Sequence, residues 1–336
     1  MRFFNYISFL KEHNFRYSSL FDDKYIDKIY SGQGESILGV FFYYLYRLIN
    51  VVKVCFNRDV SIVWIEKELF PYIPIPLEIV FNLCGKKVVY DYDDAIFHNY
   101  DKFWLIYKIK FIFIARSASV IFSGNEYISS FFTGLGAKNI ALIPTVVDII
   151  HYDNTNDITH NNDEFNIVWI GTPNTQKYLQ NLDIAFNKLQ TKYSNVRVNL
   201  IGASLSVPLT CRYQILDWNS STEVRDIKKM DVGVMPLPDL KFERGKCGYK
   251  IIQYQACKLP VLASPVGVNV DIISHGVNGF LCSSSDDWFK YLEKLLNNRE
   301  TALRMGLIGY KKINHKYTYQ KVSKKISQTL FDLKNK

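Results

Sequence analysis

Basic residues and glycines lie close together in the second half of the chain, in a pattern that suits the binding of an anion. Lys246 and Lys250 are four residues apart in "ERGKCGYKIIQYQA", so they share one face if this segment is helical. Gly245 and Gly248 let the backbone approach a ligand closely, and helix N-termini favour negative charge. These features together predict a phosphorylated ligand.

Two further loops carry similar features. "GTPNTQK" begins at Gly171 and ends at Lys177, and "NSSTE" follows residue 218. Each loop follows an expected strand, and ligands of parallel sheets bind at the C-terminal ends of the strands. We therefore expect three loops to line one crevice, with Lys177, Arg244, Lys246 and Lys250 as countercharge. The alternative is that the glycines form plain turns and the lysines are solvated helix ends, which explains one loop better than three.

The common phosphate-binding signatures do not fit. A dinucleotide site needs G-x-G-x-x-G directly after the first strand, whereas "SGQGES" (31–36) follows no apolar strand and lacks the third glycine. A P-loop needs G-x-x-x-x-G-K followed by Ser or Thr, which the sequence lacks. Both classes of nucleotide site are therefore poor fits to this sequence.

Parallel sheets must hold these loops in place. Short runs rich in Val and Ile alternate with segments of helical length (74–84, 103–116 and 125–134 in the first half), as in sheets covered on both faces. The pattern predicts two doubly wound α/β domains joined by the Asn- and Asp-rich segment 151–165. The expected strands are 60–66, 86–91, 119–123 and 140–144, then 166–170, 196–202, 213–218, 231–235 and 260–264.

Length and composition agree with a two-domain globular protein. The 336 residues are 48% hydrophobic and 22% charged, which excludes a disordered chain. The six cysteines form no C-x-x-C pair and no Cys/His cluster, which argues for a reducing compartment and against a zinc site or a disulfide framework. No secretory signal opens the sequence, so we expect a cytoplasmic protein.

Charge and apolar runs raise the question of a membrane. Residues 286–336 hold 12 Lys and Arg against 5 Asp and Glu, so most of the net charge of +9 lies there. This is either a solvated helix face or a patch for anionic lipid, and no motif points to nucleic acid. The apolar runs 38–56 and 103–115 contain basic residues and make poor membrane spans. They either cover a sheet, the interpretation we prefer, or lie near lipid.

From about residue 60 onward the sequence resembles the retaining glycosyltransferases of family 4, which have the GT-B fold. The resemblance rests on "GYKIIQYQACKLPVLASPVGVN", "HGVNGFLC" and "TALRMGLIGYKKINHKYT". "RGKCGYK", "DVGVMPL" and "VVYDYDDAIF" fit the branch that builds bacterial surface polysaccharides. The resemblance implies two Rossmann-like domains facing across a cleft: an acceptor-binding domain at 1–155 and a nucleotide-sugar-binding domain at 156–318. It also implies a last helix, 319–336, that packs back towards the first domain.

The implied activity is transfer of a sugar, with retention, from a nucleotide-sugar such as a UDP-sugar. The implied acceptor is a growing glycan or a polyprenyl-linked saccharide of lipopolysaccharide or capsule. No cofactor and no metal are expected, and the protein is expected in the cytoplasm, with peripheral contact at the inner face of an anionic membrane. Two alternatives remain: a degenerate, non-catalytic GT-B partner protein, and a nucleotide-sugar epimerase of the same fold.

The resemblance also assigns residues of the second domain. Lys177 matches a lysine that contacts the diphosphate, and Lys246 or Arg244 replaces a phosphate-binding arginine that falls on Thr172. Two family glutamates fall on Gly245 and Gln253, of which Gln253 can still hydrogen-bond a ribose hydroxyl. The full nucleotide-sugar-binding set is Gly171, Thr172, Trp218 and Asn219 (which hold the base), Glu243 (which covers the sugar), Arg244, Gly248, Tyr249, Lys250 and Gln253. Lys177 and Lys246 are counted as catalytic.

In the first domain, Asp93 is the catalytic candidate. It follows the expected strand 86–91 and falls where many family members have a histidine at the reaction centre. Asp91, Asp93 and Asp94 would raise one another's pKa, and one of them could orient an acceptor hydroxyl. Alternatively, Asp91 or Asp94 caps the next turn.

The start of the sequence departs from the family. It predicts a helix at 2–13 and a strand at 15–21, whereas family members begin with a strand and a glycine loop. The first domain would then lack its first, central strand, and its neighbours would lack a hydrogen-bonding partner. We expect that the true start lies upstream, or that the domain is adapted or impaired.

Overall fold

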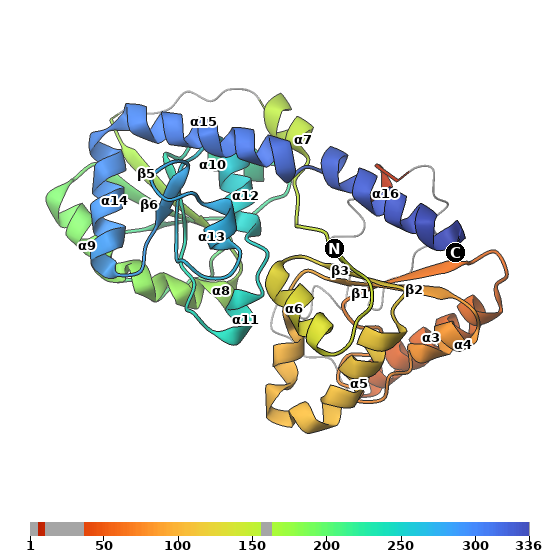
Figure 1. The fold of residues 1–336 in the computed structure, drawn as a ribbon. Coiled ribbons are helices and arrows are strands. Elements are labelled where there is room, and N and C mark those ends of the chain that lie inside the picture. The colour runs from red at the N-terminus through yellow and green to blue at the C-terminus, as the bar shows by residue number, and fades with distance from the viewer. Residues whose placement is uncertain (1–5, 11–36, 156–162, 336) are drawn as a thin grey trace. The chain divides into compact units, whose positions relative to one another are not determined.

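The computed structural model describes residues 6–10, 37–155 and 163–335, which divide into two compact units (Figure 1). The first unit comprises Met1–Ile143 and Ser323–Lys336, and the second comprises Pro144–Val322. The division therefore falls near residue 143, and the end of the chain belongs to the first unit.

The first unit contains a parallel sheet with strand order β1-β2-β3-β4 in the described residues. Figure 1 shows α3, α4 and α5 on one side of this sheet and α16 on the other. The strands are β1 (Ile62–Glu66), β2 (Lys87–Tyr92), β3 (Val120–Ser123) and β4 (Ile140–Leu142); the helices are α3 (Ile37–Phe56), α4 (Ile79–Leu83), η1 (Ile96–Phe103, a 3-10 helix), α5 (Trp104–Ser117), α6 (Glu126–Gly134) and α16 (Tyr319–Asn335).

The second unit contains a parallel sheet of six strands in the order β10-β9-β8-β5-β6-β7. Its strands are β5 (Phe165–Ile170), β6 (Val196–Ile201), β7 (Gln214–Leu216), β8 (Val232–Met235), β9 (Val261–Ala263) and β10 (Gly279–Leu281). Its helices are α7 (Ile149–Asn154), α8 (Pro173–Gln176), η2 (Lys177–Leu182), α9 (Asp183–Lys192), α10 (Glu223–Lys228), α11 (Lys241–Arg244), α12 (Tyr249–Ala256), α13 (Asn269–Ile272), α14 (Ser285–Asn297) and α15 (Arg299–Lys316).

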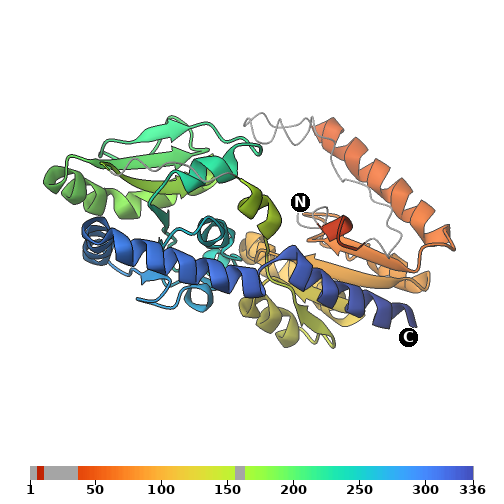
Figure 2. The same cartoon turned by 90° about the horizontal axis from the view of Figure 1, so that it is seen from above.

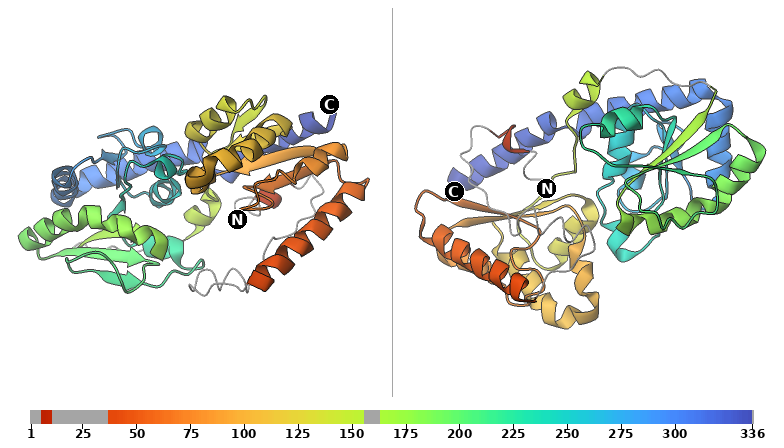
Figure 3. Two further views of the ribbon diagram at one scale, coloured as in Figure 1. Left: turned by 90° about the horizontal axis from the view of Figure 1, so that it is seen from below. Right: turned by 180° about the vertical axis from the view of Figure 1, so that it is seen from behind.

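Both faces of the second sheet are covered, as Figure 3 shows from behind. One core joins Ile251 and Ile252 of α12 to one face of the sheet, and a second joins Phe186 of α9 and Trp288 of α14 to the other. The continuous apolar strands follow from this two-sided burial. The predicted parallel α/β architecture is therefore confirmed.

The nine strands expected between residues 60 and 264 are all present, with ends that differ by at most two residues. β10 was missed because three residues that include Gly279 give no apolar pattern. α4 is shorter than the predicted helix 74–84. Pro74 and Pro76 lie at the start of that segment, and a residue that precedes a proline disfavours helical backbone. Helix α7 occupies part of the segment predicted as a linker, since the Asp148 side chain accepts a hydrogen bond from Ile150 N at 3.2 Å and caps it. Of the predicted helix 2–13 only residues 6–10 are described, and the predicted strand 15–21 lies outside the described residues.

Candidate functional site

The strand order of the second unit reverses between β5 and β8. Counted along the chain within this unit, the order is 3-2-1-4-5-6, that of dinucleotide-binding folds. Neighbouring connections leave the sheet towards opposite faces at such a point, so a crevice opens beyond the C-terminal ends of these two strands. The ends of β5 and β8 are therefore the first place to look for a ligand.

Tyr254 of α12 holds these strands apart at that point. β5 and β8 pair only at Ile167–Val232 and Val168–Gly233. Beyond this pairing, Ile170 N donates to the Tyr254 hydroxyl at 2.9 Å, which donates in turn to Val234 O at 3.4 Å. A Cβ on Gly233 would lie 2.3 Å from the tyrosine ring, so only glycine leaves room for this arrangement. The buried tyrosine satisfies the backbone where the strands diverge.

Lys250 lies directly at the end of β5. A Cβ added to Gly171 would be 2.8 Å from Lys250 Nζ and 2.4 Å from the Trp169 ring. The ammonium stands 4.5 Å from the centre of the Trp169 ring and 3.4 Å from Thr175 Oγ1. The loop after β5 and the start of α12 therefore meet, as the sequence predicts, and Gly171 makes the approach possible.

Among the described residues, the Lys250 ammonium has no negative partner. No carboxylate within residues 37–155 and 163–335 forms an ion pair with it; its polar contact is with a hydroxyl. Burial, and then the charge of Lys246, lower the pKa of Lys250 to about 7. An anion bound here would offset both effects, so this part of the site is suited to a phosphate group.

The other predicted basic residues differ in their surroundings. Lys246 is close enough to Lys250 for its charge to act on it, and its Nζ lies 5.1 Å from the centre of the Phe242 ring. Lys177 is exposed at the start of η2. The Arg244 guanidinium forms two hydrogen bonds to Asp239, at 2.6 and 3.0 Å. Of the two residues predicted to replace the arginine at Thr172, Lys246 thus lies near Lys250, whereas Arg244 is bound to Asp239.

Thr172 and Glu243 both have structural partners. Thr172 caps α8 in a reciprocal arrangement with Thr175, whose hydroxyl accepts from Thr172 N at 3.3 Å. Glu243 is buried in α11 and accepts a hydrogen bond from the Tyr178 hydroxyl. Burial and this carboxylate raise the pKa of Tyr178. Glu243 therefore ties α11 to the segment that carries Lys177.

Trp218 and Asn219 follow β7 and lie near the other loops. A Cβ on Gly202, after β6, would be 2.5 Å from Gly171 O and 3.3 Å from Trp218 Cβ. The indole remains 55% exposed, and Asn219 Oδ1 accepts from Ser221 N at 2.9 Å. The segments after β5, β6 and β7 thus come together at one end of the sheet, with a large exposed aromatic surface.

Glu223 is a carboxylate of this site to which the sequence reasoning gave no role. Its two oxygens accept hydrogen bonds from Gln253 Nε2 at 2.6 Å and from Trp218 Nε1 at 2.5 Å. It begins α10 and is the last residue of the loop "NSSTE" that we expected to line the crevice, which is the signal that could have identified it. Gln253 is buried and uncharged, and the structure places the negative charge of Glu223 beside it.

Gly248 and Tyr249 start α12. Gly248 has φ +69°, where glycine is strongly favoured, and a Cβ there would lie 2.7 Å from Ile272 Cδ1. Tyr249 is 44% exposed. Gly248 therefore sets the direction in which the helix presents Lys250.

In the first unit, Asp93 lies beside a cation. Lys67 Nζ is 3.2 Å from Asp93 and 3.6 Å from Asp94, just beyond the ends of β1 and β2. Burial opposes the charge of Lys67, but the two carboxylates outweigh it and raise its pKa. The expected mutual repulsion of Asp93 and Asp94 is thus offset by Lys67, a pairing that the sequence did not lead us to expect.

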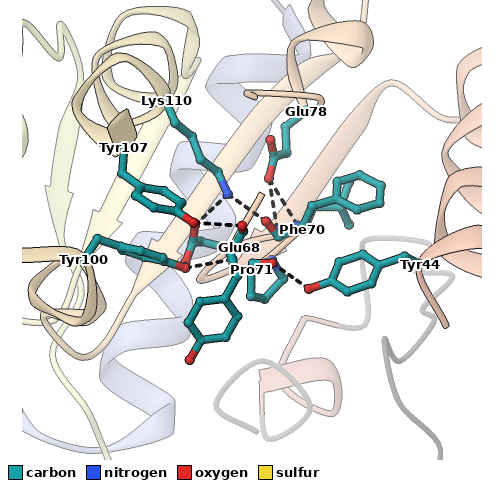
Figure 4. Close-up of polar contacts among 10 residues, drawn as sticks. Tyr44, Glu68, Phe70, Pro71, Glu78, Tyr100, Tyr107 and Lys110 are labelled. Atoms are coloured by element: carbon teal, nitrogen blue, oxygen red, sulfur yellow. Dashed lines mark hydrogen bonds and ion pairs between the residues drawn. The ribbon is translucent and has the colours of Figure 1, made fainter. Parts of the chain in front are cut away.

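A buried polar cluster lies behind this edge (Figure 4). Lys110 Nζ is 2.7 Å from Glu68 Oε1 and donates to Phe70 O at 2.7 Å. The Tyr100 hydroxyl donates to Glu68 Oε2 at 2.6 Å, and Glu78 Oε1 accepts from Phe70 N at 3.3 Å. Two carboxylates and one ammonium thus fix the segment between β1 and α4. Among the described residues, no group of three or more His, Cys, Asp or Glu could hold a metal ion.

Part of the second unit is similar to a known family. Residues 164–298 match the family model described as "Glycosyl transferases group 1". A probable sucrose-phosphate synthase of Thermosipho melanesiensis is 32% identical over 77 residues, which is 23% of this chain and 18% of that protein. The matched part therefore spans less than a fifth of the curated relative.

Similar solved structures extend over both units. HepE of Anabaena in complex with UDP-glucose is 14% identical, with a TM-score of 0.66 over 84% of this chain and 81% of that one. A mutant of S. aureus TarM in complex with Fondaparinux, alpha-GlcNAc-glycerol and UDP is 18% identical, with a TM-score of 0.59 over 75% and 51%. At such identities the likeness concerns the fold, which is that of GT-B glycosyltransferases.

Proposed function

We propose that the protein is a retaining glycosyltransferase that transfers a sugar from a UDP-sugar to a lipid-linked or growing surface glycan. The observation that carries the proposal is the Lys250 ammonium: it lies beside Gly171 at the reversal point of the sheet, without a carboxylate partner in the described part of the chain. The group 1 match over residues 164–298 and the UDP-glucose complex of HepE support a nucleotide-sugar as the anion.

In the proposed reaction, the bond between the anomeric carbon and the β-phosphate oxygen breaks, and its electron pair leaves with UDP. The acceptor hydroxyl oxygen bonds to the anomeric carbon and loses its proton. Negative charge grows on the departing diphosphate, so Lys250 and Lys246, with Lys177 as a third candidate, would stabilise the transition state without a metal. Asp93 is the candidate for orienting and deprotonating the acceptor hydroxyl.

Glu223 and Gln253 are proposed to bind the donor's hydroxyl groups. Their side chains are joined at 2.6 Å, and Glu223 also bonds to Trp218, the proposed platform for the base. A carboxylate that accepts from a hydroxyl binds more strongly than a neutral amide, which would compensate for the glutamine at 253. The acceptor is proposed to be a polyprenyl-linked saccharide used on the cytoplasmic side of a membrane.

Titration calorimetry tests the donor site most directly. UDP and GDP are titrated into the full chain, into Lys250→Met and into Lys188→Met. Lys188 is a matched control because it is a surface lysine of the same unit already paired with Asp286 at 2.9 Å. A charge-assisted contact to phosphate is worth about 1.5–3 kcal/mol, so UDP should bind roughly 10- to 150-fold more weakly to Lys250→Met and normally to the control. Unchanged affinity in Lys250→Met would remove this lysine from the site.

A second function is favoured by one specific feature. Gly245 and Gln253 stand where the resembled family has two glutamates, which suits a protein that binds a nucleotide without catalysing transfer. The two functions differ in their products, because a transferase releases UDP from a UDP-sugar only when acceptor is converted. Binding of UDP without any product from a panel of UDP-sugars and acceptors would favour the non-catalytic protein.

A further inference from the structure

Helix α3 presents a wide apolar surface to solvent. An 18-residue window, Gly39–Phe56, has a mean hydropathy of 1.3 with 11% of it buried, so by length and composition it could cross a membrane, although its two basic residues had led us to expect otherwise. Phe56 is 82% exposed. The other exposed large apolar residues of the helix are Phe41, Phe42, Leu45, Tyr46, Leu48, Ile49 and Val52.

The opposite face of α3 is fixed to its own unit. Val51 is buried there, and so is Arg47, whose pKa is lowered to about 10, mainly by burial. The Tyr44 hydroxyl donates to Pro71 O at 2.5 Å, and the Tyr44 ring stacks on Phe70 at 6.0 Å (Figure 4). A membrane span would have to abandon these contacts. The helix is therefore built to lie along a surface, with one face on protein and the other outward.

Helix α5 continues this surface. Leu105 is 85% exposed and Ile109 58%, while Phe111 and Ile114 on its other face are buried. α4, which packs against both α3 and α5, exposes Leu83. Figure 1 shows the three helices at the periphery of the first unit, and Figure 2 shows α3, in orange-red, along its outer edge. We call the outward surface of α3, α4 and α5 the α3–α5 face. The sheet-covering interpretation preferred from the sequence thus accounts for only the inner sides of these helices.

The charges on this face have one sign. Neither α3 nor α5 contains an Asp or Glu, and both carry basic residues. Lys53, Lys108 and Arg116 are exposed among the apolar side chains. Exposed aromatic and aliphatic residues, together with basic residues and no acidic ones, complement the boundary between the acyl chains and the headgroups of an anionic bilayer.

We propose that the α3–α5 face docks the protein on a membrane containing anionic phospholipid, without crossing it. The apolar side chains of α3 and α5 enter the boundary between headgroups and acyl chains, and Lys53, Lys108 and Arg116 contact lipid phosphates. The proposal goes beyond the proposed transferase activity, because it assigns a lipid-binding surface in the first unit that works with or without a nucleotide.

Flotation with lipid vesicles tests this surface in the full chain, without nucleotide or donor. Vesicles of phosphatidylcholine alone are compared with vesicles in which about one third of the lipid is phosphatidylglycerol. We expect partitioning onto the anionic vesicles that weakens with salt. Leu105→Ser combined with Ile109→Ser should reduce it about tenfold or more, and Lys108→Glu about fivefold or more. The control Leu205→Ser alters a leucine that is 90% exposed in the second unit and should change nothing.

Three outcomes would overturn the proposal: no partitioning onto anionic vesicles, equal partitioning of the α5 variants, or a dimer in light scattering that the serine variants dissociate. The last would mean that the α3–α5 face joins two copies of the chain. Circular dichroism and urea denaturation of each variant check that the first unit is folded, since the proposed nucleotide site lies in the second unit. Vesicle binding without nucleotide binding would contradict the proposed function and leave the docking surface intact. Nucleotide binding without vesicle binding would contradict the docking surface and leave the proposed function intact.

Discussion

The two units place lysines in opposite environments. In the first unit, Lys67 lies just beyond the strand ends between Asp93 and Asp94, and its pKa is raised. In the second, Lys250 lies at the strand ends beside an aromatic ring and a hydroxyl, and its pKa is lowered to about 7. The first edge therefore supplies its own counterions, whereas the second gains most from a counterion that comes from outside.

The contrast extends below the surface of the first unit. Lys110 is fully buried, yet its ammonium has Glu68 and a backbone carbonyl within 2.7 Å. A buried charge with a partner supports the fold that surrounds it, and removing the partner leaves the other charge isolated. Variants that delete one lysine in each unit should thus have opposite consequences.

The largest effect is expected from Lys110→Met. It leaves the buried Glu68 carboxylate without its cation and next to the buried Glu78, so the free energy of unfolding should fall by about 3–5 kcal/mol. Urea denaturation measures the loss, and hydrogen exchange in β1 and β2 locates it in the first unit. The double variant Lys110→Met with Glu68→Met should recover most of it, because no unpaired charge remains.

Lys250→Met is the counterpart in the second unit. It removes a poorly solvated cation without exposing a partner, so the free energy of unfolding should stay the same or rise slightly. A loss comparable to that of Lys110→Met would mean that Lys250 serves the fold, and the contrast between the two edges would disappear.

A smaller effect, on turnover alone, is expected from Asp93→Asn. General acid–base groups contribute about 10²-fold or more, so turnover should fall by at least that factor, while UDP affinity stays within about twofold. Asp94→Asn is the matched control, because it removes the same charge from the same lysine at 3.6 Å. If both variants lost activity equally, the two aspartates would serve only to hold Lys67.

The parallel sheets and the meeting of the loops could be predicted from the sequence because both depend on local patterns. Runs such as 166–170 mark strands by composition, and in a parallel sheet the C-terminal ends of strands meet at one edge. This is why Gly171 and Lys250, 79 residues apart, could be expected together. The glycines likewise indicated where backbone and side chain come close.

Pairings between distant side chains could not be predicted in this way. These pairings depend on the paths of loops and the register of strands. Examples are the contacts of Lys67 with Asp93, of Glu223 with Gln253 and of Asp239 with Arg244. The membrane question was similar, since composition alone cannot say which side of α3 is covered. A sequence lists the charges, and only the fold decides which of them neutralise one another.

The smallest expected effect is a pH dependence confined to the second unit. The pKa of Lys250 is about 7 in the folded protein and 10.5 in an unfolded chain. Between these values the unfolded chain binds more protons, so the free energy of unfolding should rise with pH. UDP binding should instead weaken, since binding must first protonate the amine. Phosphate groups with a second pKa near 6 keep their charge above pH 7, so the ligand contributes little to the change.

Calorimetry at about pH 7 and about pH 9 should show UDP affinity falling by roughly tenfold in the native protein and remaining constant in Lys250→Met. Lys246→Met should move the fall to higher pH, because the charge of Lys246 is the second cause of the lowered pKa. Lys67→Met should behave as the native protein does, because that lysine already has its counterions. An equal pH dependence of UDP affinity in Lys250→Met would show that another group controls this dependence. The contrast between Lys250, unpaired among the described residues of the second unit, and a paired Lys67 in the first would then not explain the binding of an anion.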